Sequence, residues 1–260
     1  MGVVYRKVSG IPRLRGKKKP YVIAHRGNQT ACPENTLAAF EQAIEDGADI
    51  IETDVHLTSD DVFVCIHDPS VDRTTNGKGL VADMTLEEIR GLSAGHDRRE
   101  FQHERIPTLT ETLSLIPEDR ALALELKTDR FLDEAVCERL ISTLKAEKIL
   151  DRSLILSFSM DHLKAMQRVW PEAYTGWITL TKKRPLKGPR LLGPYWRILL
   201  QNPLYVLWAH MNRQAVCPLD TSPDRRLWFY RIMGCDAVIT DNPAATCKKL
   251  GKTPGYGKHL

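Results

Sequence analysis

The sequence predicts an α/β protein, a TIM (β/α)8-type barrel with a small insertion after its early His67-bearing strand. Apolar strand-like runs and helix-like segments alternate along the chain, with about eight strands if one hairpin return is counted. The 260 residues suit a single barrel domain with a sizeable core. We expect the barrel to span residues 21–250, between a basic N-terminal arm over 1–20 and a basic C-terminal tail over 251–260.

The first part of the predicted barrel is a strand, a helix and two closely spaced strands. Tyr21–Ala24 is a short apolar run that ends at His25, and Pro33–Thr36 is typical of a helix start. The two further strand-like runs are Asp49–Val55 and Val62–Ile66. About six residues separate them, which is too few for a parallel crossover.

These two runs should therefore form a hairpin that turns at Ser59–Asp60. Counting back from the turn places Glu52 opposite His67 and Asp54 opposite Cys65. This register would bring a carboxylate and a histidine side by side.

The pattern loosens between about residues 68 and 107, where turns surround one short helix that begins at a capping box, Thr85–Glu88. We expect this stretch to be an insertion at one end of the barrel. Regular alternation then resumes, with strands predicted at Ala121–Leu126, Leu154–Phe158, Tyr174–Leu180, Ala215–Leu219 and Ala237–Thr240, and helices at Leu109–Leu115, Phe131–Glu147, Asp161–Val169 and Leu227–Met233.

Positive charge is concentrated in three stretches, although the net charge is only +4. Residues 1–20 hold seven Lys or Arg and no acid, residues 181–231 hold ten against two acids, and residues 248–258 hold four against none. These stretches are either solvated surface or contacts for anionic lipid, a phosphorylated substrate or nucleic acid. The segment 181–231 is also rich in aromatic residues, but its prolines and charges exclude a membrane span. We expect no nucleic-acid partner.

The cysteines and the N-terminus predict a cytoplasmic protein that is either free or peripheral to a membrane. The six cysteines include no CxxC pair, so neither a disulfide framework nor a zinc site is expected. No apolar stretch follows the basic N-terminal residues, as it would in a signal peptide. The oligomeric state cannot be predicted from these features.

Three carboxylates and a lysine close two of the predicted strands. Glu52 and Asp54 end one strand, and Glu125 and Lys127 end another. Because strand side chains alternate, each pair points to one face, at the barrel end where catalytic groups gather. Converging carboxylates repel one another unless a cation lies among them, and oxygen ligands select Mg²⁺ or Ca²⁺. The alternative is a set of salt bridges with Arg26 and Lys127.

Two histidines, His25 and His67, each follow a predicted strand. Imidazole titrates near neutral pH, so such a pair can take one proton and give another. A single histidine in such a place is more often a structural hydrogen-bonding residue. Two of them near the carboxylates favour an acid/base role.

The chain resembles the glycerophosphodiester phosphodiesterases over roughly residues 21 to 245. The motifs that carry the resemblance are His25-Arg26-Gly27, Pro33-Glu34-Asn35-Thr36, Glu52-Thr53-Asp54-Val55, His67-Asp68, Asp72-Arg73-Thr74-Thr75-Asn76-Gly77, Ile106-Pro107-Thr108-Leu109, Glu125-Leu126-Lys127, Ser157-Phe158 and Thr240-Asp241-Asn242-Pro243. The resemblance implies a TIM-barrel hydrolase that releases glycerol 3-phosphate and an alcohol.

The resemblance also implies a role for each candidate residue. Glu52, Asp54 and Glu125 would bind one divalent cation, Mg²⁺ or Ca²⁺. His25 and His67 would be the general acid and base, in an order that stays open, and Arg26 and Lys127 would bind the phosphate. Separately from the resemblance, we expect Pro33–Thr36 to be structural, a helix start that fixes the loop after His25, with Glu34 as a partner of the site groups.

One departure from the family concerns the substrate pocket. The family usually has a tryptophan on the strand near Val216–Asp220, where this chain has none. We expect Phe158, Trp177 or the segment Tyr195–Trp208 to supply the aromatic wall instead. Two alternatives to a glycerophosphodiesterase are a lysophospholipase D or related lipid phosphodiesterase at a membrane surface, and a catalytically silent phosphodiester-binding module.

Overall fold

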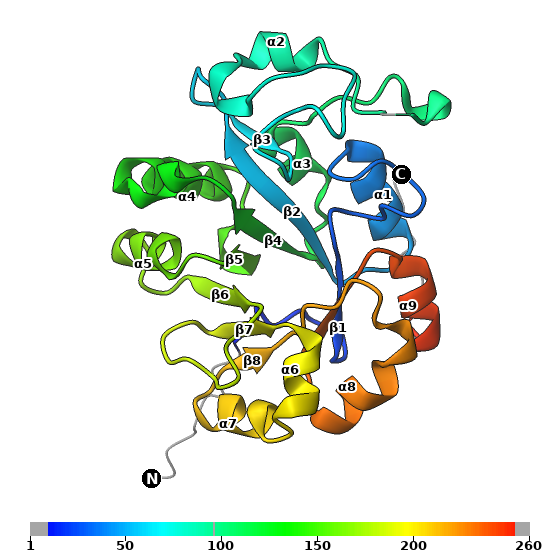
Figure 1. Cartoon of the computed structure of the whole chain (residues 1–260), viewed down its shortest axis with the longest axis vertical. Coiled ribbons are helices and arrows are strands. Elements are labelled where there is room, and N and C mark those ends of the chain that lie inside the picture. Colours follow the sequence, from blue (N-terminus) through cyan, green and yellow to red (C-terminus); the bar gives the residue numbers. More distant parts are fainter. Residues whose placement is uncertain (1–9, 96, 253–260) are drawn as a thin grey trace.

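Eight parallel strands curl into a nearly closed barrel in the computed structural model, which describes residues 10–95 and 97–252 (Figure 1). The strands follow one another around the described barrel in the order β8-β7-β6-β5-β4-β2-β1-β9. Between β8 and β9 the Asp236 amide donates a hydrogen bond of 2.8 Å to the Val216 carbonyl. The predicted barrel is confirmed, whereas residues 1–9 of the predicted arm and 253–260 of the tail lie outside the described residues.

The strands of the barrel are short, and a ninth strand, β3, pairs antiparallel with β2. Their bounds are β1 Tyr21–Ala24, β2 Ile50–Leu57, β3 Phe63–Cys65, β4 Ala121–Leu126, β5 Ser153–Ser157, β6 Tyr174–Thr179, β7 Leu191–Pro194, β8 Ala215–Val216 and β9 Ala237–Thr240.

Alternation along each strand produces two apolar layers. Ile50, Ala121 and Ala123 belong to the cluster inside the barrel, while Ile51 and Leu122 belong to the larger cluster between sheet and helices. The strands are buried on both faces, as expected for a parallel sheet. Side chains in step with the inner set therefore point into the barrel.

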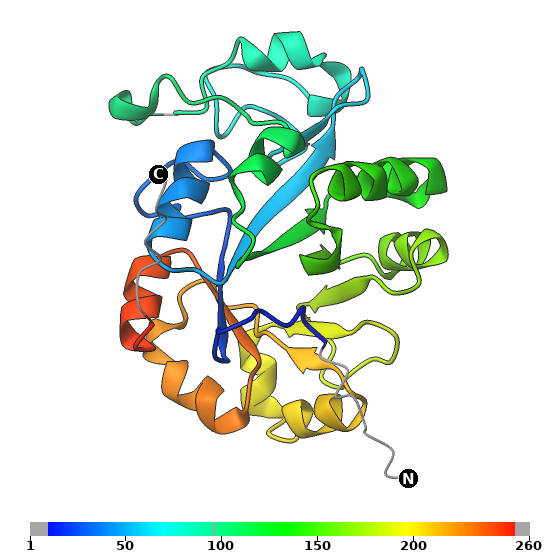
Figure 2. The same cartoon turned by 180° about the vertical axis from the view of Figure 1, so that it is seen from behind.

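Helices surround the barrel on its outside (Figures 1 and 2). The α-helices are α1 Leu37–Glu45, α2 Leu86–Arg90, α3 Leu109–Leu115, α4 Glu134–Ala146, α5 Met160–Val169, α6 Trp196–Gln201, α7 Tyr205–Met211, α8 Leu227–Met233 and α9 Pro243–Lys249. The 3₁₀ turns are η1 Val81–Asp83, η2 Arg99–Phe101, η3 Asp129–Leu132, η4 Leu150–Arg152 and η5 Pro223–Arg225. Within the described residues, no helix has both the length and the apolar character needed to cross a membrane.

Helix caps agree with the start signals in the sequence. Thr36 accepts a hydrogen bond from the Ala39 amide at the start of α1, and Thr85 forms a capping box with Glu88. The predicted helix Phe131–Glu147 is divided instead, because Asp133 caps α4 after the 3₁₀ turn η3.

The predicted hairpin exists, but its predicted register is wrong by one residue. Val55 pairs with Cys65, and the Ile66 amide donates to the Asp54 carbonyl at 3.1 Å. The turn runs one residue further than expected, with Asp61 at φ 66° and the Thr58 amide bonded to the Val62 carbonyl.

Strand β7 was missing from the sequence prediction, which counted the hairpin return as a barrel strand in its place. Its sequence is Leu-Leu-Gly-Pro within a basic segment, and the Gly-Pro pair is typical of a turn rather than a strand. The structure tolerates Pro194 because it is the last residue of the strand.

The segment between β3 and α3 forms its own small apolar cluster at the arrowhead end of β2 (Figures 1 and 2). This cluster contains Val71, Val81 and Ile89 and joins the barrel through Val64 and Ile66. The segment holds α2, η1 and η2, and its described residues supply no strand to the barrel. It lies over the end of the barrel where the candidate site is found.

Candidate active site

Three buried carboxylates point into the barrel at its C-terminal end. Asp54 and Glu125 are direct register partners on β2 and β4, and Glu52 lies two residues before Asp54 on the same face. Each can offer one oxygen so that all three oxygens lie within 4.8 Å of one another. The predicted convergence of these residues is therefore present in the structure.

The electrostatics of the cluster are unbalanced. Burial, reinforced by the charge of Asp54, raises the pKa of Glu52 to about 7. Burial also raises the pKa of Glu125, although Lys127 offsets part of the effect. For Asp54 the burial effect is outweighed by Lys127 and Arg26, which lower its pKa. Full ionisation of all three carboxylates would be favoured by one more cation.

Lys127 lies between two of the carboxylates. Its Nζ donates to Glu125 Oε1 at 2.6 Å and lies 3.1 Å from Asp54 Oδ1. The second contact is an ion pair without hydrogen-bond geometry, since Asp54 Oδ1 is buried and has no hydrogen-bond partner among the described residues. This lysine has the position from which it could also contact a bound anion.

Arg26 follows β1 in a left-handed turn. Its φ is 55°, and Gly27 has φ 80°, where an added Cβ would lie 2.5 Å from the Ala39 carbonyl carbon. The turn lets the Arg26 amide donate to Glu52 Oε2 at 2.8 Å and brings Nε within 3.2 Å of Asp54 Oδ2. Arg26 and Lys127, the two cations of the salt-bridge alternative, therefore both contact the carboxylates. The same carboxylates form these ion pairs and could bind a metal ion.

His25 lies at the end of β1, where its amide bonds to the Thr240 carbonyl of β9. Its Nδ1 lies 2.7 Å from Asp241 Oδ1, and Gln29 Nε2 donates to the same oxygen at 2.7 Å. Burial alone would lower the pKa of His25, but the Asp241 hydrogen bond and the charge of Glu52 outweigh it and raise that pKa.

His67 follows β3 on the hairpin side of the site. Its Nδ1 lies 2.6 Å from Asp68 Oδ1, and its ring acts electrostatically on Asp54 and Glu125. Glu52, its predicted neighbour, shows no such effect among its main electrostatic partners. In the observed register His67 is not opposite Glu52, and its electrostatic effect falls on Asp54 and Glu125.

The loop before α1 supports the cluster with hydrogen bonds from two residues. Asn35 Nδ2 donates to Asp54 Oδ2 at 2.9 Å, and its Oδ1 accepts from the Thr53 hydroxyl at 2.8 Å. Glu34 accepts a hydrogen bond of 2.9 Å from Arg26 Nη1, as expected of a partner of these groups.

The two aromatic pocket candidates lie in different environments. Phe158 follows β5, is 46% exposed, and its ring centroid lies 5.9 Å from Lys127 Nζ. Trp177 is buried in the layer between sheet and helices, and its Nε1 donates to the Phe158 carbonyl at 3.0 Å. Of these two, Phe158 is the one available at the mouth, and the position of Trp177 on the outward face of β6 does not support a pocket role.

Several supporting residues were absent from the sequence prediction of the site. These are Gln29, Asn35, Asp68, Arg73 and Asp241. All but Gln29 belong to motifs that carry the resemblance, but no role in the site was assigned to them, because most of their contacts join residues that are far apart in the chain.

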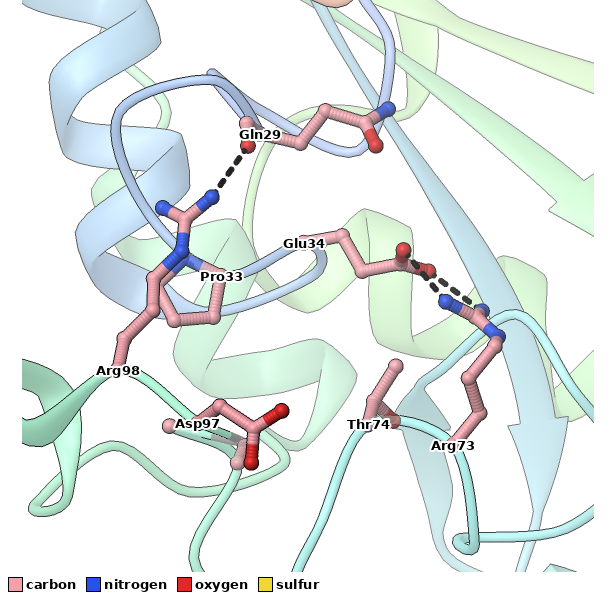
Figure 3. Close-up of a pocket in the computed structure, with 9 residues that line it drawn as sticks. Gln29, Pro33, Glu34, Arg73, Thr74, Asp97 and Arg98 are labelled. Carbon is pink, nitrogen blue, oxygen red and sulfur yellow. Dashed lines mark hydrogen bonds and ion pairs between the residues drawn. The ribbon is translucent and has the colours of Figure 1, made fainter.

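A cavity of about 310 Å³ is lined by residues other than the three carboxylates (Figure 3). The loop before α1 forms one wall with Gln29 and Glu34, and the segment between β3 and α3 forms the other with Arg73 and Arg98. Arg98 Nη2 donates to the Gln29 carbonyl at 3.1 Å, and Arg73 contacts Glu34 (Figure 3).

The donor set fits a divalent cation. Oxygen ligands lie about 2.0 to 2.6 Å from Mg²⁺ or Ca²⁺, so two ligands of one ion are at most about 5 Å apart. The three carboxylate oxygens meet that limit. The buried Asp54 Oδ1, without a hydrogen-bond partner in the described chain, is a natural ligand atom.

Sequence comparisons relate the chain to known hydrolases. A sequence profile described as the glycerophosphoryl diester phosphodiesterase family matches residues 25–245. The chain is 46% identical over 234 residues to a glycerophosphodiester phosphodiesterase of Caldanaerobacter subterraneus subsp. tengcongensis, covering 86% of this chain and 95% of that protein. A glycerophosphodiester phosphodiesterase of Bacillus altitudinis is 31% identical over 241 residues, covering 87% and 96%.

Solved structures agree with these matches. A phosphodiesterase of Oleispira antarctica, in complex with the product sn-glycerol-3-phosphate, superposes with a TM-score of 0.79 at 28% identity, covering 90% of this chain and 97% of that one. A glycerophosphodiester phosphodiesterase of Parabacteroides distasonis has a TM-score of 0.74 at 26% identity, covering 89% and 96%. Both comparisons extend over nearly the whole described barrel.

Proposed function

The chain belongs to the glycerophosphoryl diester phosphodiesterase family, and we propose that it hydrolyses glycerophosphodiesters to glycerol 3-phosphate and an alcohol. The observation that carries the proposal is the set of three inward carboxylates bordered by Arg26 and Lys127. Such a site can hold a cation and a phosphodiester together.

The proposed metal ligands are Glu52, Asp54 and Glu125, holding one Mg²⁺ or Ca²⁺. When bound, the cation supplies positive charge that neutralises the phosphodiester oxygens. Arg26 and Lys127 bind the same phosphate from the rim of the cluster. Their charges stabilise the negative charge that grows on the phosphate oxygens during the reaction.

His25 and His67 are the proposed acid and base. The oxygen of a water or of the glycerol hydroxyl forms a bond to phosphorus while the bond from phosphorus to the leaving alcohol breaks. With the hydroxyl, this step gives a cyclic phosphodiester, which a water then opens to glycerol 3-phosphate by breaking one ring bond to phosphorus. One histidine takes the proton of the attacking oxygen, and the other gives a proton to the departing oxygen. Asp241 and Asp68 occupy the Nδ1 sides of the two rings, which leaves Nε2 of each ring for these transfers.

A substrate panel tests this function. Glycerophosphocholine, glycerophosphoethanolamine and lysophosphatidylcholine are incubated with the protein and either Mg²⁺ or Ca²⁺. We expect release of glycerol 3-phosphate from the first two substrates. A clear preference for lysophosphatidylcholine would favour the lipid phosphodiesterase instead, and no turnover of any diester would refute the proposal.

A peripheral membrane contact is proposed on separate grounds. No Asp or Glu lies between Glu172 and Asp220, whereas this stretch holds seven Lys or Arg. Within it, α6, α7 and their connection carry exposed apolar side chains, which are Leu200, Leu204, Leu207, Trp208 and Met211. A basic surface with exposed apolar residues complements an anionic bilayer.

Vesicle sedimentation tests the contact. We expect binding to vesicles that contain phosphatidylglycerol, loss of that binding at high salt, and weaker binding after Leu207→Glu. Leu132→Glu is the control, because Leu132 is similarly exposed on η3. Equal binding by both variants and the wild type would contradict a contact through α7.

A further inference from the structure

Arg73 bridges two parts of the site through three side-chain hydrogen bonds. Its Nη1 and Nη2 donate to the two Glu34 oxygens, both at 2.8 Å, and its Nε donates to Asp68 Oδ2 at 2.5 Å. Figure 3 shows the paired contacts with Glu34 across the cavity wall. A planar guanidinium makes these bonds from three separate nitrogens in a rigid fork, whereas the three donors of a lysine share one nitrogen.

Each carboxylate that Arg73 holds also holds a residue of the proposed machinery. Glu34 Oε1 accepts a hydrogen bond from Arg26 Nη1 at 2.9 Å. Asp68 Oδ1 lies 2.6 Å from His67 Nδ1. A continuous path therefore runs from the proposed phosphate-binding arginine to a proposed proton carrier, and Arg73 is its middle member.

We propose that Arg73, from the segment between β3 and α3, is a positioning residue that sets Arg26 through Glu34 and His67 through Asp68. The inference rests on the proposed function for the roles of Arg26 and His67. It assigns to this segment a part in aligning two groups that follow different strands, Arg26 after β1 and His67 after β3.

The charge state of Asp68 explains how this would act on His67. The hydrogen bond from Arg73 is the main cause that lowers the pKa of Asp68 to about 2. An ionised carboxylate accepts hydrogen bonds only, so His67 must carry its proton on Nδ1 to make this contact. The ring orientation, and with it the direction in which Nε2 points, then depends on Asp68 being held in place.

An ordinary surface ion pair is the competing explanation. Arg73 is 46% exposed, and single exposed pairs have little energetic effect. Arg73, however, contacts a Glu34 side chain that is only 14% exposed and makes a forked contact plus a third bond. The two explanations differ in what they predict for turnover relative to stability.

The test compares Arg73→Gln, Arg73→Lys and Arg90→Gln. Arg90 is the matched control, because it lies in the same segment, on α2, and pairs at 2.7 Å with Glu111 away from the site. Values of kcat and KM are measured on the best glycerophosphodiester, together with the urea midpoint of each variant. We expect kcat to fall by about 10-fold to 100-fold in Arg73→Gln, the usual effect of removing a residue that orients others.

We expect Arg73→Lys to recover only a small part of kcat, and both Gln variants to keep similar urea midpoints. The kcat of Arg90→Gln should equal that of the wild type. Wild-type kcat in Arg73→Gln would overturn the inference while leaving the proposed function intact. The inference would also be overturned if Arg73→Gln lowered kcat and the urea midpoint together, so that unfolding alone accounted for the lower kcat.

A second measurement does not need turnover. The Nδ1 proton of His67, assigned by comparison with His67→Gln, is followed by NMR in the wild type and in Arg73→Gln. We expect the signal to shift or broaden in Arg73→Gln and to stay unchanged in Arg90→Gln. If the wild type has no phosphodiesterase activity, the proposed function fails, and an unchanged His67 signal in Arg73→Gln would separately refute the positioning role.

Discussion

Replacing Asn35 with glycine tests how the loop before α1 supports the carboxylate cluster. Asn35 is buried, has φ 55°, and links the Asp54 carboxylate to the Thr53 hydroxyl. Glycine removes these contacts and is suited to positive φ, so backbone strain does not add to the effect. The Asn35 amide hydrogen bond to the Arg26 carbonyl is kept.

The expected loss of stability follows mainly from these two hydrogen bonds, because the third bond of the side chain, from the Asp54 amide to Asn35 Oδ1, is long at 3.4 Å. A bond to a charged carboxylate contributes about 1.5 to 3 kcal/mol, and a neutral bond about 1 kcal/mol. Relief of the left-handed conformation returns about 1 kcal/mol. We therefore expect Asn35→Gly to lower the free energy of unfolding by about 1.5 to 3 kcal/mol.

Urea denaturation at neutral pH measures this change. The control is Lys148→Gly, since Lys148 is exposed and has φ 54°. We expect the control to be neutral or slightly stabilised. If Asn35→Gly were as stable as the wild type, the buried hydrogen bonds to Asp54 would not contribute as described.

Three further predictions concern single side chains. His67→Ala should abolish turnover while the circular dichroism spectrum and urea midpoint stay close to wild type; retained turnover would move the proton transfer elsewhere. Lys127→Met should lower kcat/KM by at least about 100-fold, as expected for removing a charge that stabilises the transition state, and near-normal kinetics would contradict a phosphate contact. Burial would raise the pKa of Asp236, but hydrogen bonds from His210 and Lys19 outweigh it and lower that pKa. The ionised Asp236 therefore stabilises the fold at pH values above the ordinary Asp pKa, and this contribution is lost as pH falls through the pKa of the folded protein. Asp236→Asn should therefore destabilise the protein at pH 7 and progressively less below about pH 4, and a pH-independent difference between the two proteins would contradict this account.

The inward-facing residues of the barrel could be predicted because strand alternation is a local rule. Glu52 with Asp54, and Glu125 with Lys127, were expected on one face from their spacing alone, and the structure places both pairs inside the barrel mouth. The start of α1 at Thr36 was also local, since a side-chain cap depends on residues three apart.

Features that depend on distant contacts could not be predicted in the same way. The hairpin register depends on the turn at Asp61, and a one-residue change moves every pairing. Strand β7 exists because it hydrogen-bonds to β6 and β8, although its own sequence resembles a turn. The contact between Asp241 and His25 spans 216 residues and follows from β9 lying beside β1.

The measurement that tests the central claim most directly is metal-dependent release of glycerol 3-phosphate by protein that has been freed of metal with a chelator. We predict no release from glycerophosphocholine without added metal, and recovery when Mg²⁺ or Ca²⁺ is supplied. Added metal should not restore release in Asp54→Asn. The substitution removes the negative charge of the carboxylate whose buried Oδ1 has no hydrogen-bond partner in the described structure. Undiminished release by the metal-free wild-type protein would contradict the claim.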